Sequence, residues 1–216
     1  MKKVLLIFLL AFTILFASSC TNKKRTINKK EESDDLLITI YSDNGKSDSK
    51  FLIKSFGHSF LALKNLTGSE MYIRDYKIEK DDEITFGAWG IDDHFGIWYD
   101  LEAQYQHKAK RYDGVVSVSA YISSDKLGLI NEFITNNDTW TFKHNCTYLA
   151  ITIWNMCVDS NERFSKRTFN SPSRLHKLIK RFDSYETNRE MIMHEYAFTF
   201  KDGVKYSYYL EEKSYG

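Results

Sequence analysis

The sequence predicts a single α+β domain that follows a distinct N-terminal segment. Two kinds of pattern indicate this mixture: short runs of alternating or β-branched residues that are typical of strands, and longer stretches with apolar residues at helical spacing. The chain has 216 residues, of which 43% are hydrophobic, and this length suffices for one domain with its own core. No linker or internal repeat follows Leu36, so we expect one domain over residues 36–216.

Charge and cysteine content exclude several classes of protein. The chain carries 30 basic and 29 acidic side chains, whereas nucleic-acid-binding proteins normally show a strong basic excess. Three cysteines are too few for a disulfide scaffold. The single proline, Pro172, excludes Pro-rich stalks and collagen-like segments. We therefore expect no nucleic-acid partner and no disulfide framework.

Residues 1–20 have the layout of a bacterial export signal. Two lysines precede an apolar run over 4–17, which is too short to span a bilayer comfortably, since that takes about 20 apolar residues. Small residues then lead to Cys20, an arrangement that resembles a lipobox, in which the cysteine receives lipid and becomes the new N-terminus. We expect removal of residues 1–19 and lipidation of Cys20. Ordinary cleavage near Ser19, with Cys20 incidental, is the alternative.

Residues 20–35 are polar, with a basic block followed by an acidic one. This composition is typical of a flexible tether. No later stretch is apolar enough for long enough to span a bilayer. The expected location is therefore that of an exported bacterial lipoprotein, held at a membrane of the cell envelope through its N-terminal lipid.

Strand character falls into separate short segments. In chain order these are Leu36–Ser42, Ser59–Leu63, Glu70–Ile78, Ile84–Trp89, Val115–Ile122, Met191–Phe200 and Val204–Leu210. We expect the second and third to pair around a turn at 65–69. The last two flank Lys201-Asp-Gly203, which predicts a terminal hairpin.

Four segments are expected to be helical. The first covers about 98–108, and the second begins at Ser123 or Ser124 and carries apolar residues on one face up to Ile134. The stretch 147–158 is apolar throughout, so periodicity alone does not separate a buried helix from a buried strand; its length and the preceding asparagine favour a helix. The last helix starts at Ser171, with proline in its first turn.

With Cys20 assigned to lipid, Cys146 and Cys157 remain. In one helix at about 1.5 Å per residue, they lie roughly 16 Å apart, whereas a disulfide tolerates no more than about 7 Å between Cα atoms. Two free thiols are therefore expected. Cys157 lies inside an apolar stretch, where a small buried hydrophobic residue is the ordinary interpretation.

Cys146 differs because it lies in the predicted first turn, after the predicted N-cap Asn145. Helix N-termini carry unpaired N–H groups and positive potential, which stabilise a thiolate and lower the pKa of a cysteine. The same N–H groups can hold an oxyanion during acyl transfer. Cys146 is either a nucleophile or a buried core thiol.

A nucleophilic cysteine needs a nearby base. His58 is the best candidate, because it opens a predicted strand where a sheet would fix its ring. His144 is close in sequence but is expected to point elsewhere, as a loop residue at a pocket rim. Asp92, Asp93 and His94 could ligate a metal, yet no second ligand cluster accompanies them, and a hydrated turn is favoured. We expect neither a metal nor a cofactor.

The order of these elements, histidine before cysteine, resembles the circularly permuted papain-like cysteine hydrolases of the NlpC type, whose relatives include lecithin retinol acyltransferase-like proteins. The matching pieces are Gly57–Leu61, His144–Ala150, Thr85–Gly90 and Gly96–Glu102, and the resemblance, to a bacterial lipoprotein branch of that group, spans about 50–180. It implies a permuted papain-like fold, in which an antiparallel sheet packs against a helix opening at Cys146.

The resemblance also implies a Cys–His mechanism, with Cys146 attacking a carbonyl carbon and His58 taking and returning the proton. The third, orienting residue would lie on the strand after the histidine strand, about a dozen residues after the histidine. Glu70 is our choice, with Asn65 and Tyr72 also reachable, because a carboxylate would stabilise the charged imidazole. An ordinary exposed glutamate at a strand end is the alternative.

Three functions are compatible with these features. The first is a lipid-anchored thiol hydrolase or acyltransferase that acts on amide or ester bonds at the cell envelope, with peptidoglycan peptides as the first expected substrate and acyl lipids as the second. The second is a non-catalytic surface module of the same fold that binds a partner. A metal-binding lipoprotein is the weakest, since the histidine spacings match no known cluster.

Overall fold

The computed structural model describes residues 24–45, 57–91 and 94–211. The predicted signal, Cys20, Asp92 and Asp93 lie outside the described residues. Within them the chain forms a large antiparallel sheet, a small two-stranded sheet and four α-helices. The predicted α+β class is therefore confirmed.

The large sheet has eight strands in the order β10-β9-β6-β5-β2-β1-β7-β8, and every pair is antiparallel. In chain order the strands are β1 (Leu36–Asp43), β2 (His58–Asn65), β5 (Glu83–Ile91), β6 (His94–Tyr99), β7 (Val116–Ile122), β8 (Glu186–Thr187), β9 (Ala197–Lys201) and β10 (Val204–Tyr208). The small sheet pairs β3 (Met71–Ile73) with β4 (Tyr76–Ile78).

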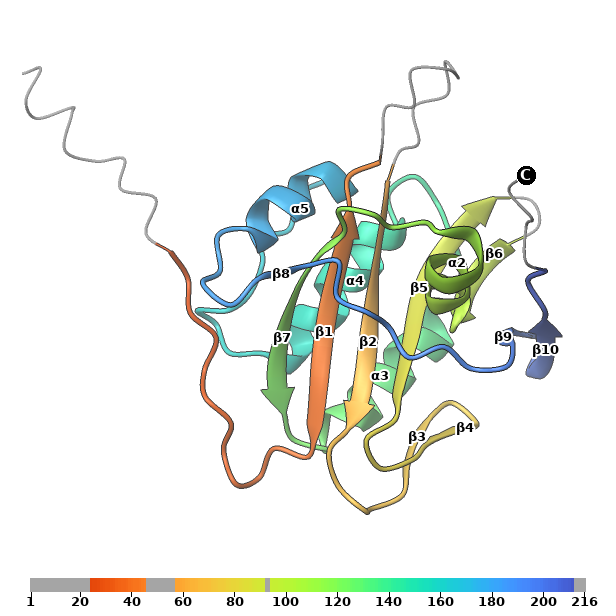
Figure 1. The fold of residues 1–216 in the computed structure, drawn as a ribbon, viewed down its shortest axis with the longest axis horizontal. Coiled ribbons are helices and arrows are strands. Elements are labelled where there is room, and N and C mark those ends of the chain that lie inside the picture. Colours follow the sequence, from red (N-terminus) through yellow and green to blue (C-terminus); the bar gives the residue numbers. More distant parts are fainter. Residues whose placement is uncertain (1–23, 46–56, 92–93, 212–216) are drawn as a thin grey trace, which may run out of the picture.

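Helices cover both faces of the large sheet (Figure 1). They are α2 (Leu101–Ala109), α3 (Lys126–Asn136), α4 (Cys146–Cys157) and α5 (Pro172–Ile179). One core cluster joins β1 and β2 to α3, α4 and α5, and a second joins the opposite face to α2. Because both faces are covered, β2 is buried at nearly every position, and this explains the unbroken apolar run at its centre, Phe60–Leu63.

The starts of α4 and α5 follow from local capping chemistry. The side chain of Asn145 accepts a hydrogen bond from the Tyr148 N–H at 3.0 Å. Ser171 caps α5 in the same way, and Pro172 occupies the first helical position, where its missing N–H costs nothing. The stretch 147–158 is thus a helix, as its length and the preceding asparagine predict.

Three predicted segments differ in the structure. The segment 70–78 does not pair with β2; it turns back on itself at Arg74, whose φ is 55°, and forms the separate β3–β4 hairpin. The first predicted helix begins later, because residues 98–99 belong to β6 and the left-handed Asp100 separates that strand from α2. The strand expected from Met191 begins only at Ala197, since side chains of α2 and its cap bind the Met191 and His194 N–H groups.

The described part of the expected tether lies against the domain. The backbone of Arg25 forms an isolated β-bridge with that of Phe182, just after α5. The Arg25 guanidinium lies 4.2 Å from the centre of the Phe182 ring. Lys24 forms an ion pair with Asp183 at 3.4 Å. Within the described residues, no helix has both the length and the apolar character needed to cross a membrane.

Candidate functional site

His58 and Cys146 meet at one end of the sheet. His58 is the first residue of β2, and Cys146 is the first residue of α4, the helix that packs behind that strand in Figure 1. The imidazole ring and the thiol interact with each other: the thiol raises the pKa of the ring, and the ring lowers the pKa of the thiol. Each residue is 9% exposed, so the pair is buried while keeping a small opening to solvent. The structure therefore brings together two of the three catalytic residues that the sequence indicates.

A chain of buried hydroxyl groups holds the two elements in this position. The Thr147 hydroxyl, next to Cys146, lies 3.2 Å from that of Ser59, next to His58. Ser59 in turn lies 3.1 Å from the Ser42 hydroxyl, which donates to the Pro172 carbonyl at 2.8 Å. These contacts fasten the starts of α4 and α5 to β1 and β2. The thiol and the imidazole are therefore placed by their immediate neighbours in sequence.

The carboxylate at His58 belongs to Glu102, in the first turn of α2. Its Oε1 lies 2.9 Å from His58 Nε2 and accepts a second hydrogen bond from the Trp89 indole N–H, also at 2.9 Å. Glu102 is fully buried, and its position in the first helical turn favours a negative charge. No pattern in the sequence singles out Glu102 as catalytic. Because Glu102 occupies Nε2, the other ring nitrogen, Nδ1, is left for the thiol.

Gly87 of β5 provides the space for this arrangement. A Cβ atom at Gly87 would lie 3.1 Å from His58 Nε2 and 2.9 Å from Phe60 Cβ, and would overlap Glu102 Oε1. Glycine inside a strand weakens it and often marks the close approach of another group. This glycine, within the quoted segment 85–90, is the sequence signal that could have pointed to a neighbouring functional group.

The structure does not bring Glu70 to this pair. Glu70 lies beyond the opposite end of β2 from His58, where it forms an ion pair with Lys77 at 3.0 Å and accepts from the Tyr72 hydroxyl at 3.4 Å. Asn65 also lies at that far end and binds the turn that follows it. The resemblance implies an orienting residue on the strand that follows the histidine strand, whereas the carboxylate on the ring comes from α2, 44 residues after His58.

The electrostatics of the pair favour a thiolate and an imidazolium. Burial opposes the charged ring, but its interactions with Cys146 and with the Glu102 carboxylate, which accepts from the ring N–H, outweigh burial and raise the pKa of His58 to about 9. Burial also opposes a thiolate at Cys146, yet the His58 ring, the Ser59 backbone N–H and the Thr147 hydroxyl together lower the pKa of this thiol. Proton transfer from sulfur to the ring is thus favoured near neutral pH.

The N-terminus of α4 offers donors for an oxyanion. The first backbone N–H groups of any helix lack partners within the helix. Asn145 binds the N–H groups of Tyr148, through its side chain, and of Leu149, through its carbonyl. Among the described residues, no such acceptor accounts for the N–H groups of Cys146 and Thr147. These two groups lie beside the sulfur, where an oxyanion would form.

The other thiol, Cys157, and the histidines His144 and His94 lie in surroundings that indicate structural roles. Burial raises the pKa of Cys157 to about 12, so its thiol stays protonated and unreactive. His144 is exposed, and its ring lies 4.6 Å from that of Tyr148. His94 is buried against Trp98 and Tyr208, each 4.8 Å away between ring centres. Within 24–45, 57–91 and 94–211, no group of three or more His, Cys, Asp or Glu side chains could hold a metal ion.

Comparisons with known proteins give no match. No protein-family model matches this chain, and no curated protein or solved structure is significantly similar to it.

Proposed function

We propose that the protein is a thiol enzyme that transfers acyl groups, with Cys146 as nucleophile, His58 as proton carrier and Glu102 as the residue that orients the ring. The interaction of His58 with the Cys146 thiol, with the Glu102 carboxylate hydrogen-bonded to the ring at 2.9 Å, is the observation that carries this proposal. A nucleophile bound to a base that a third group orients is the general arrangement for covalent acyl transfer.

The chemistry follows from the positions of these groups. The Cys146 thiolate attacks a carbonyl carbon, and the resulting oxyanion is stabilised by the N–H groups of Cys146 and Thr147. The His58 imidazolium then donates its proton to the departing amine or alcohol, which leaves an acyl-thioester on Cys146. In the second half, neutral His58 takes a proton from water or another acceptor, whose oxygen or nitrogen attacks the thioester and releases the thiolate. Glu102 stabilises the charged ring in both halves.

The substrate class and location rest on the sequence. A permuted papain-like fold, a lipid at Cys20 and export to the cell envelope would present the site to amide or ester bonds found there. Peptidoglycan stem peptides are the first candidates, because the envelope supplies them, and lipid acyl esters are the second. Supporting this fold type, α4 opens at the cysteine and packs on an antiparallel sheet whose second strand opens at the histidine.

Alkylation of Cys146 tests the proton transfer. The full chain is treated with iodoacetamide at pH 6, and labelling of each cysteine is followed by peptide mass spectrometry in the wild type, His58→Ala and His144→Ala. We expect fast labelling of Cys146 in the wild type and a loss of about 100-fold in His58→Ala, in line with the effect of removing a general base. The matched control His144→Ala should label like the wild type. Cys157 should stay unlabelled in all three.

The low exposure of both residues, 9% each, supports a second candidate, a binding module of the same fold without catalysis. Slow labelling that does not change in His58→Ala would favour that module and contradict the enzyme. The substrate is then sought by incubating the full chain with peptidoglycan or lipid extracts. A covalent acyl adduct on Cys146, absent from Cys146→Ala, would identify the transferred group by its mass.

A further inference from the structure

Two segments beside Cys146 carry basic residues and no acidic ones. Residues 164–182 contain six lysines and arginines and no aspartate or glutamate, and 139–158 contain one lysine and again no acidic residue. The whole chain has a net charge of only +1. Basic residues are therefore concentrated in these two segments, and acidic residues elsewhere in the chain balance their charge.

The two segments meet at the opening of the site. The loops before and after α4 present Phe142 and Phe169, which are 72% and 55% exposed and lie 5.4 Å apart between ring centres. The Asn145 side chain donates to the carbonyls of Asn170, at 2.9 Å, and Phe142, at 3.4 Å. The residue that caps α4 therefore also joins the two loops. An exposed aromatic pair stands next to the residue that precedes Cys146.

The cations around this pair have neutral partners. The Arg174 guanidinium donates to the carbonyl and hydroxyl of Ser165, and the Lys166 ammonium lies 5.7 Å from the centre of the Tyr148 ring. Burial and the repulsion of Arg167 and Arg181 lower the pKa of Arg174. Among the described residues, Lys77, Lys126 and Arg189 pair with carboxylates, but no cation of 164–182 does.

The N-terminal segment joins the domain close to these cations. Lys24 pairs with Asp183, and Arg25 bridges to Phe182, both immediately after the last basic residue of this stretch. The chain from Cys20 to Lys24 covers four residues, which reach at most about 14 Å when extended. A lipid on Cys20, as the sequence predicts, would hold this end of α5 close to the bilayer.

We propose that the surface formed by Phe142, Lys143, Lys166, Arg167, Phe169 and Arg174 docks on a bilayer containing anionic phospholipid. Juxtamembrane basic clusters are attracted to anionic headgroups, and exposed apolar rings insert at the headgroup boundary. A soluble polyanion would use the charges but leave the phenyl rings in water. Docking places the opening beside Cys146 against the membrane. The proposal goes beyond acyl transfer and does not depend on it.

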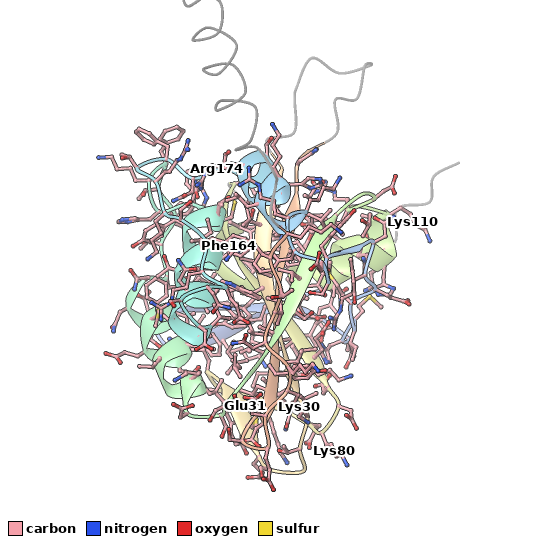
Figure 2. The ribbon with its side chains drawn as sticks, turned by 90° about the vertical axis from the view of Figure 1, so that its left-hand side faces the viewer. Lys30, Glu31, Lys80, Lys110, Phe164 and Arg174 are labelled. Carbon is pink, nitrogen blue, oxygen red and sulfur yellow. The ribbon has the colours of Figure 1, made fainter. Side chains whose placement is uncertain are left out.

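Lysine footprinting of the full chain in vesicles tests the docking. The chain is reconstituted in vesicles of phosphatidylcholine alone or mixed with phosphatidylglycerol, and acetylation rates of Lys143 and Lys166 are compared with those of Lys80 and Lys110. Figure 2 shows Arg174, a residue of α5, at one end of the molecule, and Lys80 at the opposite end. We expect acetylation of the two docking lysines to slow about five-fold in anionic vesicles only, and to recover in 1 M salt, where charge attraction is screened.

Paired variants separate a membrane from other partners. Phe142→Ser with Phe169→Ser should lose the protection in vesicles, as should Lys166→Glu with Arg167→Glu, whereas Lys80→Glu with Lys110→Glu should keep it. Cys146→Ala should be protected like the wild type, so a failure of the proposed chemistry does not alter this result. Equal rates in neutral and anionic vesicles would overturn the proposal. So would protection that survives loss of both phenyl rings, since charge alone then explains the binding.

Discussion

His58 and His194 have the same protonation behaviour in different surroundings. Each ring contacts anionic groups, and in each case hydrogen bonds outweigh burial and raise the histidine pKa to about 9. His194 lies between two carboxylates, Asp82 at 2.9 Å from Nε2 and Asp100 at 3.0 Å from Nδ1. His58 has one carboxylate, Glu102, and one thiol, Cys146.

The difference shows that a shifted histidine pKa does not by itself mark a reactive site. Both nitrogens of His194 are held by carboxylates, which favour the charged ring, and this cation ties 191–196 to the start of α2. At His58 one partner can give up a proton and become a nucleophile. Perturbed pKa values occur at structural ion pairs as well as at functional sites. The chemistry of the partner separates the two cases.

The largest effect on the His58 site is expected when the space at Gly87 is filled. In Gly87→Ala the added methyl group meets Glu102, His58 Nε2 and Phe60 Cβ, so the carboxylate must leave the ring. We expect Cys146 alkylation at pH 6 to fall by about 100-fold, as for loss of the base, and the free energy of unfolding to fall by about 1–3 kcal/mol through overpacking. Rates of labelling and urea unfolding measure the two effects.

Gly128 provides the matched control. It lies in α3, and an added Cβ there meets no atom within 4 Å. Gly128→Ala should raise the free energy of unfolding by up to about 1 kcal/mol, since alanine is the better helix former, and leave Cys146 labelling unchanged. If Gly87→Ala labelled as fast as Gly128→Ala, Glu102 would have no part in activating the thiol.

Removing only the charge of Glu102 should make His58 behave less like His194. In Glu102→Gln the side chain keeps its shape, but the imidazolium loses its anionic partner. We expect the pKa of the thiol to rise and alkylation at pH 6 to slow about ten-fold, measured as a pH–rate profile. Glu70→Gln, which changes the carboxylate favoured from the sequence, should keep the wild-type profile. The reverse result would restore Glu70 to the mechanism.

The part of the site that is local in sequence could be predicted. The start of α4 depends on Asn145 capping a long apolar stretch, and both signals lie within a few residues of Cys146. His58 could be chosen because it opens a strand. The contact between them could only be inferred by resemblance, since 88 residues separate the hydroxyl-bonded neighbours Ser59 and Thr147.

Glu102 could not be predicted, because three non-local features deliver it. The β5–β6 hairpin must return the chain beside β2, Asp100 must adopt a left-handed conformation at φ 59°, and Gly87 must leave the space open. No propensity indicates a positive φ at an aspartate inside this stretch. The β3–β4 hairpin was missed for the same reason, since it turns at Arg74 with a φ of 55°.

Part of the pH dependence of stability should come from His194. Its pKa is raised from 6.5 to about 9, so its stabilising effect is fully present below about pH 6.5 and is lost as pH rises to about 9. Between these pH values the free energy of unfolding of the wild type should decrease. In His194→Gln we expect this decrease to be smaller by about 1–2 kcal/mol, after allowance for solvent screening. Urea unfolding at a series of pH values measures this, and the same slope in both proteins would contradict the role of His194 as a cation.

The smallest effect is expected from the indole of Trp89, whose place at His194 is taken by the hydroxyl of Tyr76. Its N–H donates to the same Glu102 oxygen that His58 contacts, and its ring lies 4.3 Å from the imidazole. In Trp89→Phe most of the packing is retained, but the carboxylate loses one of two donors. Because a hydrogen bond to a charged group is partly replaceable by rearrangement or water, we expect alkylation of Cys146 to slow only about three-fold, near the lower range of such contributions.

Trp98→Phe, whose indole does not contact Glu102 in the described structure, is the control. A loss as large as that in Glu102→Gln would mean that the indole, and not the charge alone, holds the carboxylate on the ring.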